Sequence, residues 1–128
     1  MNNNKLKITF LGGVGEIGKN MTALEYNDEI VIVDAGLTFP DDDLPGVDIV
    51  IPDMSYIIEN KDKVKALLLT HGHEDHIGAV PFLLEQVPVT IYGSRLTLAL
   101  VENKMKEHPK VKYKTVAVKP KNVLKIGN

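Results

Sequence analysis

Short apolar runs separated by polar or glycine-containing turns follow one another along the chain, and they predict the strands of a sheet. Residues 30–33 (Ile-Val-Ile-Val) are continuously apolar, as expected of a strand buried on both faces. The pair Asn27-Asp28 favours a tight turn before this strand. The predicted strands are residues 5–11, 21–26, 29–34, 64–70, 89–92 and 111–118, with shorter candidates at 47–51 and 123–126.

Other apolar positions recur at helical spacing. They predict a short helix over residues 55–60, a second helix over 77–87, and a third that begins after the capping residue Ser94 and ends near residue 107. Pro81 is compatible with the second helix only near its first turn. Strands dominate the first half of the chain and alternate with helices in the second, so we expect one α/β layered domain with a mixed sheet and flanking helices.

Three of the four histidines stand in one segment, Thr70-His71-Gly72-His73-Glu74-Asp75-His76, directly after an apolar run. Imidazole nitrogen and carboxylate oxygen are suitable ligands for zinc and related divalent ions. On a helix these side chains would point in different directions, whereas in a loop at the carboxyl end of a strand they can converge. We therefore predict a loop over residues 71–76 whose metal ligands are His71, His73, Asp75 and His76.

Two further acidic residues are candidates for supporting roles. Asp34 ends the apolar run 30–33, where a carboxylate must be paired or hydrogen-bonded. It either orients the histidine loop without binding metal itself or initiates a turn before Ala35-Gly36, and the sequence leaves both open. Glu74 lies within the histidine segment; for it we favour exposure to solvent or a contact with a ligand over a role as catalytic base.

The segment Gly13-Val14-Gly15-Glu16-Ile17-Gly18 matches the G-x-G-x-x-G pattern of dinucleotide-binding proteins. That motif requires a helix to begin within it, so that the N-terminus of the helix can hold the pyrophosphate. Residues 21–26 are too few for a crossover helix and lead straight into a turn and a strand. We expect instead a glycine-rich turn near the active site, whose backbone N–H groups could meet a substrate phosphate.

Composition narrows the class of protein. The chain has no cysteine, which excludes disulfides and thiolate metal sites. No apolar run approaches the roughly 18 residues of a membrane span, and the first residues lack the apolar segment of a secretory signal. We therefore expect a cytoplasmic protein with no membrane partner.

Charge is unevenly distributed along the chain. Residues 1–94 hold six Lys/Arg against fifteen Asp/Glu, and residues 95–128 hold nine against two, so a charge of −9 precedes one of +7 within a net charge of −2. A lysine-rich third can contact nucleic-acid phosphates, although an ordinary solvated surface is the commoner explanation.

Longer motifs carry a family resemblance. Residues 67–79, which surround the histidine segment, look like the signature of the metallo-β-lactamase superfamily, whose members hydrolyse many ester, amide and phosphodiester bonds. Residues 11–21 (Leu-Gly-Gly-Val-Gly-Glu-Ile-Gly-Lys-Asn-Met) resemble the start of the ribonuclease J family, in the β-CASP group of nucleases. Residues 34–40 and 45–53 resemble that family too, so the resemblance covers essentially the whole chain.

The resemblance implies an αββα metallohydrolase sandwich and an RNA substrate, with 5′-to-3′ exonuclease activity beside endonuclease activity. It assigns His71 and His73 to a first metal ion, and Asp75 and His76 to a second ion and to catalysis. Zinc is the usual metal and manganese is possible, while Asp34 matches the first acidic motif of the family. For the full-length protein we expect a homo-oligomer.

The chain also departs from the family pattern. The family needs a further histidine, a bridging aspartate and a last histidine, whereas after His76 this chain has only His108 and no aspartate. We therefore expect residues 1–128 to be the N-terminal, incomplete part of the hydrolase domain and to be inactive alone. Two alternatives stay open: a hydrolase of a small ester, thioester, lactone or phosphodiester with the same fold, and a non-catalytic metal- or RNA-binding fragment.

Overall fold

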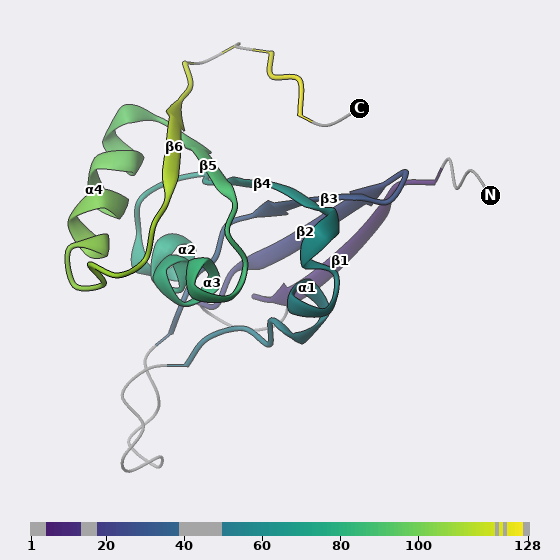
Figure 1. The fold of residues 1–128 in the computed structure, drawn as a ribbon, viewed down its shortest axis with the longest axis horizontal. Coiled ribbons are helices and arrows are strands. Elements are labelled where there is room, and N and C mark those ends of the chain that lie inside the picture. Colours follow the sequence, from purple (N-terminus) through teal and green to yellow (C-terminus); the bar gives the residue numbers. More distant parts are fainter. Residues whose placement is uncertain (1–4, 14–17, 39–49, 120, 122, 127–128) are drawn as a thin grey trace.

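The structure is a computed structural model that describes residues 5–13, 18–38, 50–119, 121 and 123–126. Within these ranges the strands form one sheet in the order β1-β2-β3-β4-β5-β6 (Figure 1). The strands are β1 (Lys7–Gly12), β2 (Met21–Tyr26), β3 (Glu29–Val33), β4 (Val64–Leu68), β5 (Thr90–Gly93) and β6 (Lys114–Ala117). The helices are α1 (Ser55–Glu59), a 3₁₀ turn (Lys61–Lys63), α2 (Glu74–Ile77), α3 (Val80–Gln86) and α4 (Arg95–Met105).

The sheet is mixed, as predicted. Strands β1, β2 and β3 pair antiparallel, and β3, β4, β5 and β6 pair parallel. Parallel strands need crossovers, and the helices that follow β4 and β5 supply them. The carboxyl ends of the four parallel strands therefore meet at one edge of the sheet, where ligand sites of α/β folds form.

The core lies between one face of the sheet and the helices. Ala23 pairs with Ile32 on that face, and both side chains are buried together with Leu67, Leu83 and other apolar residues of the cluster. Burial of this apolar surface is the main contribution to the stability of such a layer. Among the described residues the longest helix, α4, has 11 residues, which is too short to span a membrane.

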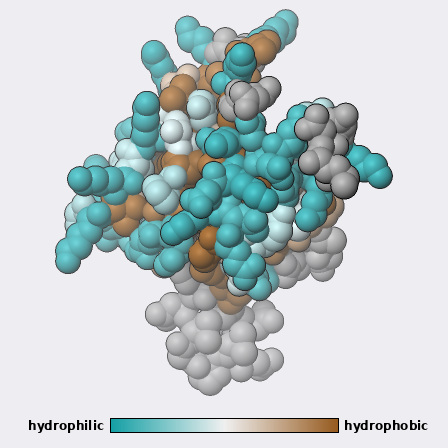
Figure 2. Space-filling model, turned by 45° about the vertical axis from the view of Figure 1, so that its right-hand side comes forward, coloured by the Kyte–Doolittle hydropathy of each residue, from teal (hydrophilic) through white to brown (hydrophobic). Residues whose placement is uncertain are grey.

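The other face of the sheet is less covered. Val31 and Val33 are half-buried, so the prediction that residues 30–33 are buried on both faces is wrong for these two side chains. Ile8 pairs with Leu24 on the same face and is 52% exposed. Figure 2 shows hydrophobic side chains at the surface of the molecule among hydrophilic ones. We call Ile8, Phe10, Leu24, Val31 and Val33 the open face of the sheet.

Of the predicted helices, the third is confirmed and the second is wrong as a single helix. The third helix is confirmed as α4, because the Ser94 hydroxyl accepts a hydrogen bond from the Thr97 backbone N–H at 3.2 Å and caps it. The second is wrong as one continuous helix, because Ile77 ends α2 and residues 80–86 form α3 with Pro81 in its first turn. Proline at 81 would clash with the carbonyl of Ile77 in an uninterrupted helix.

Two short strand candidates did not become strands among the described residues. Residues 123–126 are irregular, and Val123 is 95% exposed, since no neighbouring strand pairs with this segment. Val50 makes only an isolated bridge with Thr38, and residues 47–49 lie outside the described residues.

Candidate metal centre

The site lies where β3 and β4 end side by side. Asp34 follows β3, and its backbone N–H still donates to the Leu68 carbonyl of β4 at 2.8 Å. The chain then leaves β4 through Thr70 and His71 and enters α2 at Glu74. The prediction of a loop over residues 71–76 is therefore correct for residues 71–73 and wrong for residues 74–76, which form the first turn of α2.

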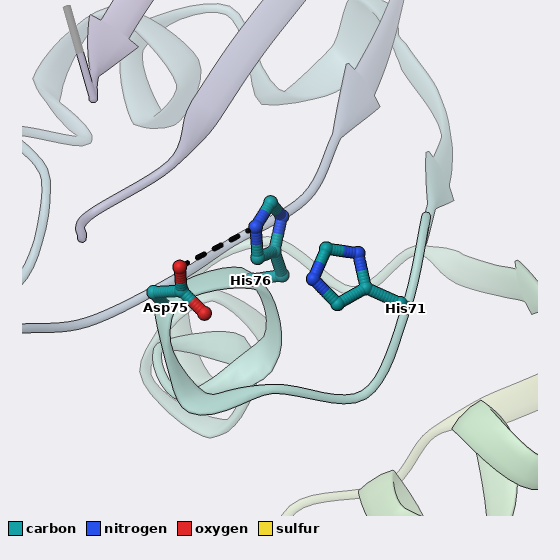
Figure 3. Close-up of side chains that lie close together, drawn as sticks. All are labelled: His71, Asp75 and His76. Atoms are coloured by element: carbon teal, nitrogen blue, oxygen red, sulfur yellow. Dashed lines mark ion pairs between the residues drawn. The ribbon is translucent and has the colours of Figure 1, made fainter. Parts of the chain in front are cut away.

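Three of the four predicted metal ligands come together. The ligand atoms of His71, Asp75 and His76 all lie within 4.8 Å of one another. Figure 3 shows the His71 and His76 rings facing each other, with Asp75 on the far side of His76. The ring centroids of the two histidines are 3.8 Å apart, and His76 Nε2 is 3.5 Å from Asp75 Oδ2. Two imidazoles and a carboxylate at this separation fit a divalent cation.

His73 lies beside this group rather than in it. Its ring meets the His71 ring edge-on, with centroids 4.8 Å apart. It is also the residue at which the backbone enters α2, with extended angles of φ −79° and ψ 151°. The structure thus places His73 next to His71 and outside the group formed by His71, Asp75 and His76.

Asp34 contacts the Nδ1 side of the His76 ring. The Asp34 side chain is 8% exposed, and its carboxylate accepts hydrogen bonds from the Thr70 backbone N–H and hydroxyl, both at 2.8 Å. Its Oδ2 lies 2.7 Å from His76 Nδ1. A carboxylate at Nδ1 favours the tautomer with the proton on that nitrogen, which leaves the Nε2 lone pair for a metal ion. Asp34 therefore contacts the histidine segment directly.

Glu74 has a partner outside the metal-ligand group. Its carboxylate forms an ion pair with Lys104 of α4, with an Oε1–Nζ distance of 2.6 Å. The Glu74 side chain is 48% exposed, so this pair ties α2 to α4 at the surface. This exposure agrees with the solvent-exposed position that we favoured for Glu74, and its lack of a catalytic role stays a prediction.

Asn20 is a site residue that the sequence did not single out. Its Nδ2 donates to the Asp75 carbonyl at 3.0 Å and lies 3.4 Å from both Asp75 Oδ2 and His76 Nε2. The contact joins residues 55 positions apart, which no local pattern reveals. Two signals could have found it: Asn20 stands directly behind the glycine-rich segment, and it lies within residues 11–21, the motif that carries the family resemblance.

The glycine-rich segment borders the site, as expected. A cleft of about 220 Å³ is lined by Gly12, Gly13, Asn20, Asp34 and His76, together with residues of β1, β2 and β3. Gly13 and Gly18 have positive φ angles of 89° and 85°, which suit a turn rather than a helix. Strand β2 follows at Met21, in agreement with our argument against a dinucleotide site, and residues 14–17 lie outside the described residues.

Comparison with known sequences identifies the family to which the chain is similar. Residues 14–127 match the metallo-beta-lactamase superfamily. Ribonuclease J 1 of Streptococcus pyogenes is 59% identical over 105 residues, which make up 82% of this chain and 19% of that protein. Ribonuclease J 2 of Staphylococcus aureus is 55% identical over 117 residues, or 89% of this chain and 21% of that protein. The chain spans about one fifth of the length of these curated relatives.

Solved structures resemble the chain in fold. A metallo-beta-lactamase fold protein from Bacillus subtilis, YhfI, aligns with a TM-score of 0.57 at 20% identity, covering 96% of this chain and 50% of that one. A diphosphatase of the PhnP family aligns with a TM-score of 0.52 at 18% identity, covering 79% and 38%. With the sheet, the histidine segment and the sequence match in agreement, the chain belongs to the metallo-beta-lactamase superfamily.

Proposed function

We propose that the intact protein is a metal-dependent ribonuclease that hydrolyses RNA phosphodiester bonds, with 5′-to-3′ exonuclease and endonuclease activity. The observation that carries this proposal is the identity of 55–59% with ribonucleases J over a segment that contains the His71–Asp75–His76 group. The proposal concerns the intact protein, because the described group supplies only part of the ligands that two metal ions need.

We assign His71 and His73 to one divalent cation and Asp75 and His76 to a second, with zinc as the first choice and manganese as the second. The donor set supports this assignment, because nitrogen and oxygen ligands suit both metals. The remaining ligands would come from residues beyond 128. When bound, such a pair of cations would lower the pKa of a water molecule and stabilise charge on the phosphoryl oxygens.

The chain's own residues prepare this chemistry. The Asp34 carboxylate holds the proton on His76 Nδ1 and so keeps Nε2 available as a ligand. We propose catalytic roles for Asp75 and His76, since His76 lines the cleft beside the glycine-rich turn and its Nε2 lies 3.5 Å from Asp75 Oδ2. A phosphate group in that cleft would lie close to the backbone of Gly12 and Gly13.

Five lysines of the lysine-rich third form two groups with different expected roles. Lys110, Lys112 and Lys114 line cavities beside Pro88 and Thr90, at the amino ends of β5 and β6. That edge of the sheet is opposite the metal centre, so these lysines would contact RNA only far from the cleaved bond. Lys121 and Lys125 follow the carboxyl end of β6, the edge where the metal centre lies. We propose phosphate contacts for this second group.

Mutation of the metal ligands tests the proposal. His73→Ala and Asp75→Ala in the intact protein are expected to abolish cleavage of a 5′-monophosphorylated RNA, measured by gel electrophoresis of end-labelled substrate. His108→Ala is the matched control, because His108 lies against Phe82 and Glu85, outside the metal-ligand group. Wild-type cleavage by either ligand variant would contradict the assignment.

Two assays separate the alternatives. The intact protein should cleave RNA and leave small esters and thioesters unchanged, and the reverse result favours the small-substrate hydrolase. Metal analysis of the purified 128-residue chain should find weak binding. Two tightly held ions per chain would contradict our expectation that the chain holds an incomplete metal site.

We also propose that the protein is cytoplasmic and homo-oligomeric. Light scattering of the intact protein tests the oligomeric state.

A further inference from the structure

Asn20 connects two segments that are remote in sequence at the metal centre. Its backbone N–H donates to the Asp75 carbonyl at 3.1 Å, and its own carbonyl accepts from the Gly36 backbone N–H at 2.9 Å. These two bonds use only main-chain atoms. They hold the turn before β2 against α2 and the segment after β3, whatever side chain residue 20 carries.

The side chain of Asn20 makes a second and separate set of contacts. Nδ2 donates to the same Asp75 carbonyl at 3.0 Å and reaches Asp75 Oδ2 at 3.4 Å. The amide is enclosed by the glycine-rich turn, because a Cβ atom added to Gly13 would lie 2.5 Å from Asn20 Oδ1. The amide group therefore touches both the main chain and the carboxylate of one predicted ligand.

The Asp75 carboxylate has little else to orient it. It lies in the first turn of α2, its side chain is 41% exposed, and among the described residues its partners are Asn20 and His76. A carboxylate that is free to change rotamer must lose that freedom when it binds a cation, and the affinity falls accordingly. An amide that already holds the carboxylate reduces this cost.

We propose that Asn20 is a positioning residue that orients Asp75 and thereby sets the affinity of the Asp75–His76 half of the site for its divalent cation. The inference rests on the metal centre of the proposed function. Partners that hold metal ligands in place typically contribute about 10–100-fold in metal affinity. The main-chain hydrogen bonds of residue 20 persist in a side-chain variant, so we expect the fold to survive removal of the Asn20 amide group.

Metal titration of the intact protein tests this role. Metal-free Asn20→Ala is titrated with Co²⁺ against a competing chelator and followed by visible absorption, which reports on the ligands of the cation. One of two bound ions should bind about 10–100-fold more weakly, with an altered spectrum. RNA cleavage at low metal concentration should fall through kcat rather than KM, and added metal should restore it.

Asn60→Ala is the matched control. Asn60 Nδ2 also donates to a backbone carbonyl, that of Tyr56 at 2.8 Å, but it does so at the end of α1, away from the metal ligands. The control should keep wild-type Co²⁺ affinity and spectrum. Thermal unfolding of each metal-free variant separates loss of orientation from loss of fold.

Three results would overturn the proposal: wild-type Co²⁺ affinity and spectrum in Asn20→Ala, an equal loss of affinity in Asn60→Ala, or a loss that scales with a lowered unfolding temperature. If Asn20→Ala fails to fold, Asn20→Leu replaces it, since leucine keeps the branched shape and lacks the donor. A Co²⁺ effect in a protein that cleaves no RNA would sustain this inference while the proposed function fails.

Discussion

Asp34 combines an unusual backbone conformation with an almost fully buried charge. Its φ angle is +64°, a left-handed value that aspartate tolerates better than most residues. This conformation turns the chain at the end of β3 and directs the carboxylate at Thr70 and His76. The two roles that the sequence left open for Asp34, turn residue and support for the histidine segment, are thus compatible in one residue.

Replacement of Asp34 by alanine should weaken both the fold and the metal centre. The change leaves the Thr70 N–H and hydroxyl without their acceptor, which costs about 1–3 kcal/mol of unfolding free energy. Loss of the carboxylate at His76 Nδ1 should lower metal affinity about 10–100-fold. Chemical denaturation measures the first effect and chelator competition the second. Unchanged metal affinity would show that Asp34 acts on the turn alone.

At the scale of elements, α2 is held by neighbours rather than by its own sequence. Four residues are too few for a stable isolated helix. The segment after β3 supplies main-chain hydrogen bonds, since Ala35 N–H donates to the His76 carbonyl at 2.9 Å and Leu37 N–H to the Glu74 carbonyl at 3.0 Å. Between them, Gly36 approaches α2 so closely that a Cβ atom would lie 1.7 Å from the Asp75 carbonyl oxygen.

Gly36→Ala should therefore push α2 away from β3. We expect it to lower the unfolding free energy of the intact protein by at least about 2 kcal/mol, as overpacking does, and to weaken metal binding. Gly93→Ala is the control, because a Cβ there would meet its nearest atoms at an ordinary 3.5 Å and should change stability by less than about 1 kcal/mol. Equal stability of the two variants, measured by denaturant titration, would refute the close contact.

At the scale of the whole molecule, the helices cover one face of the sheet and leave the open face partly exposed. Ile8 and Phe10 are 52% and 63% exposed on β1, which is also an edge strand. A contiguous apolar face of this kind usually packs against another layer. We propose that in the intact protein the second sheet of the αββα sandwich covers it, which agrees with a chain that spans about one fifth of its relatives.

Substitution of Ile8 by aspartate in the intact protein tests whether a second sheet covers the open face. If the open face is covered, the variant should lose about 2–5 kcal/mol of unfolding free energy, as buried isoleucines do on truncation. Leu96→Asp provides the comparison, because Leu96 is 73% exposed on α4 and should change stability by no more than about 0.5 kcal/mol. Similar small effects of both substitutions in thermal unfolding would mean that the face stays open.

The sequence by itself determined the approximate positions of the six strands and the α4 cap at Ser94, and it identified the clustered imidazole and carboxylate groups of the histidine segment. These features follow from the spacing of apolar residues and from the chemistry of single side chains, and both can be identified from consecutive residues of the sequence. Only the tertiary structure decided that α2 begins inside that segment, that Val31 and Val33 stay half-buried, and that Asn20 and Asp34 contact the site. The last two contacts span 55 and 42 residues and depend on how the ends of the strands and their connecting turns pack, which no local pattern encodes.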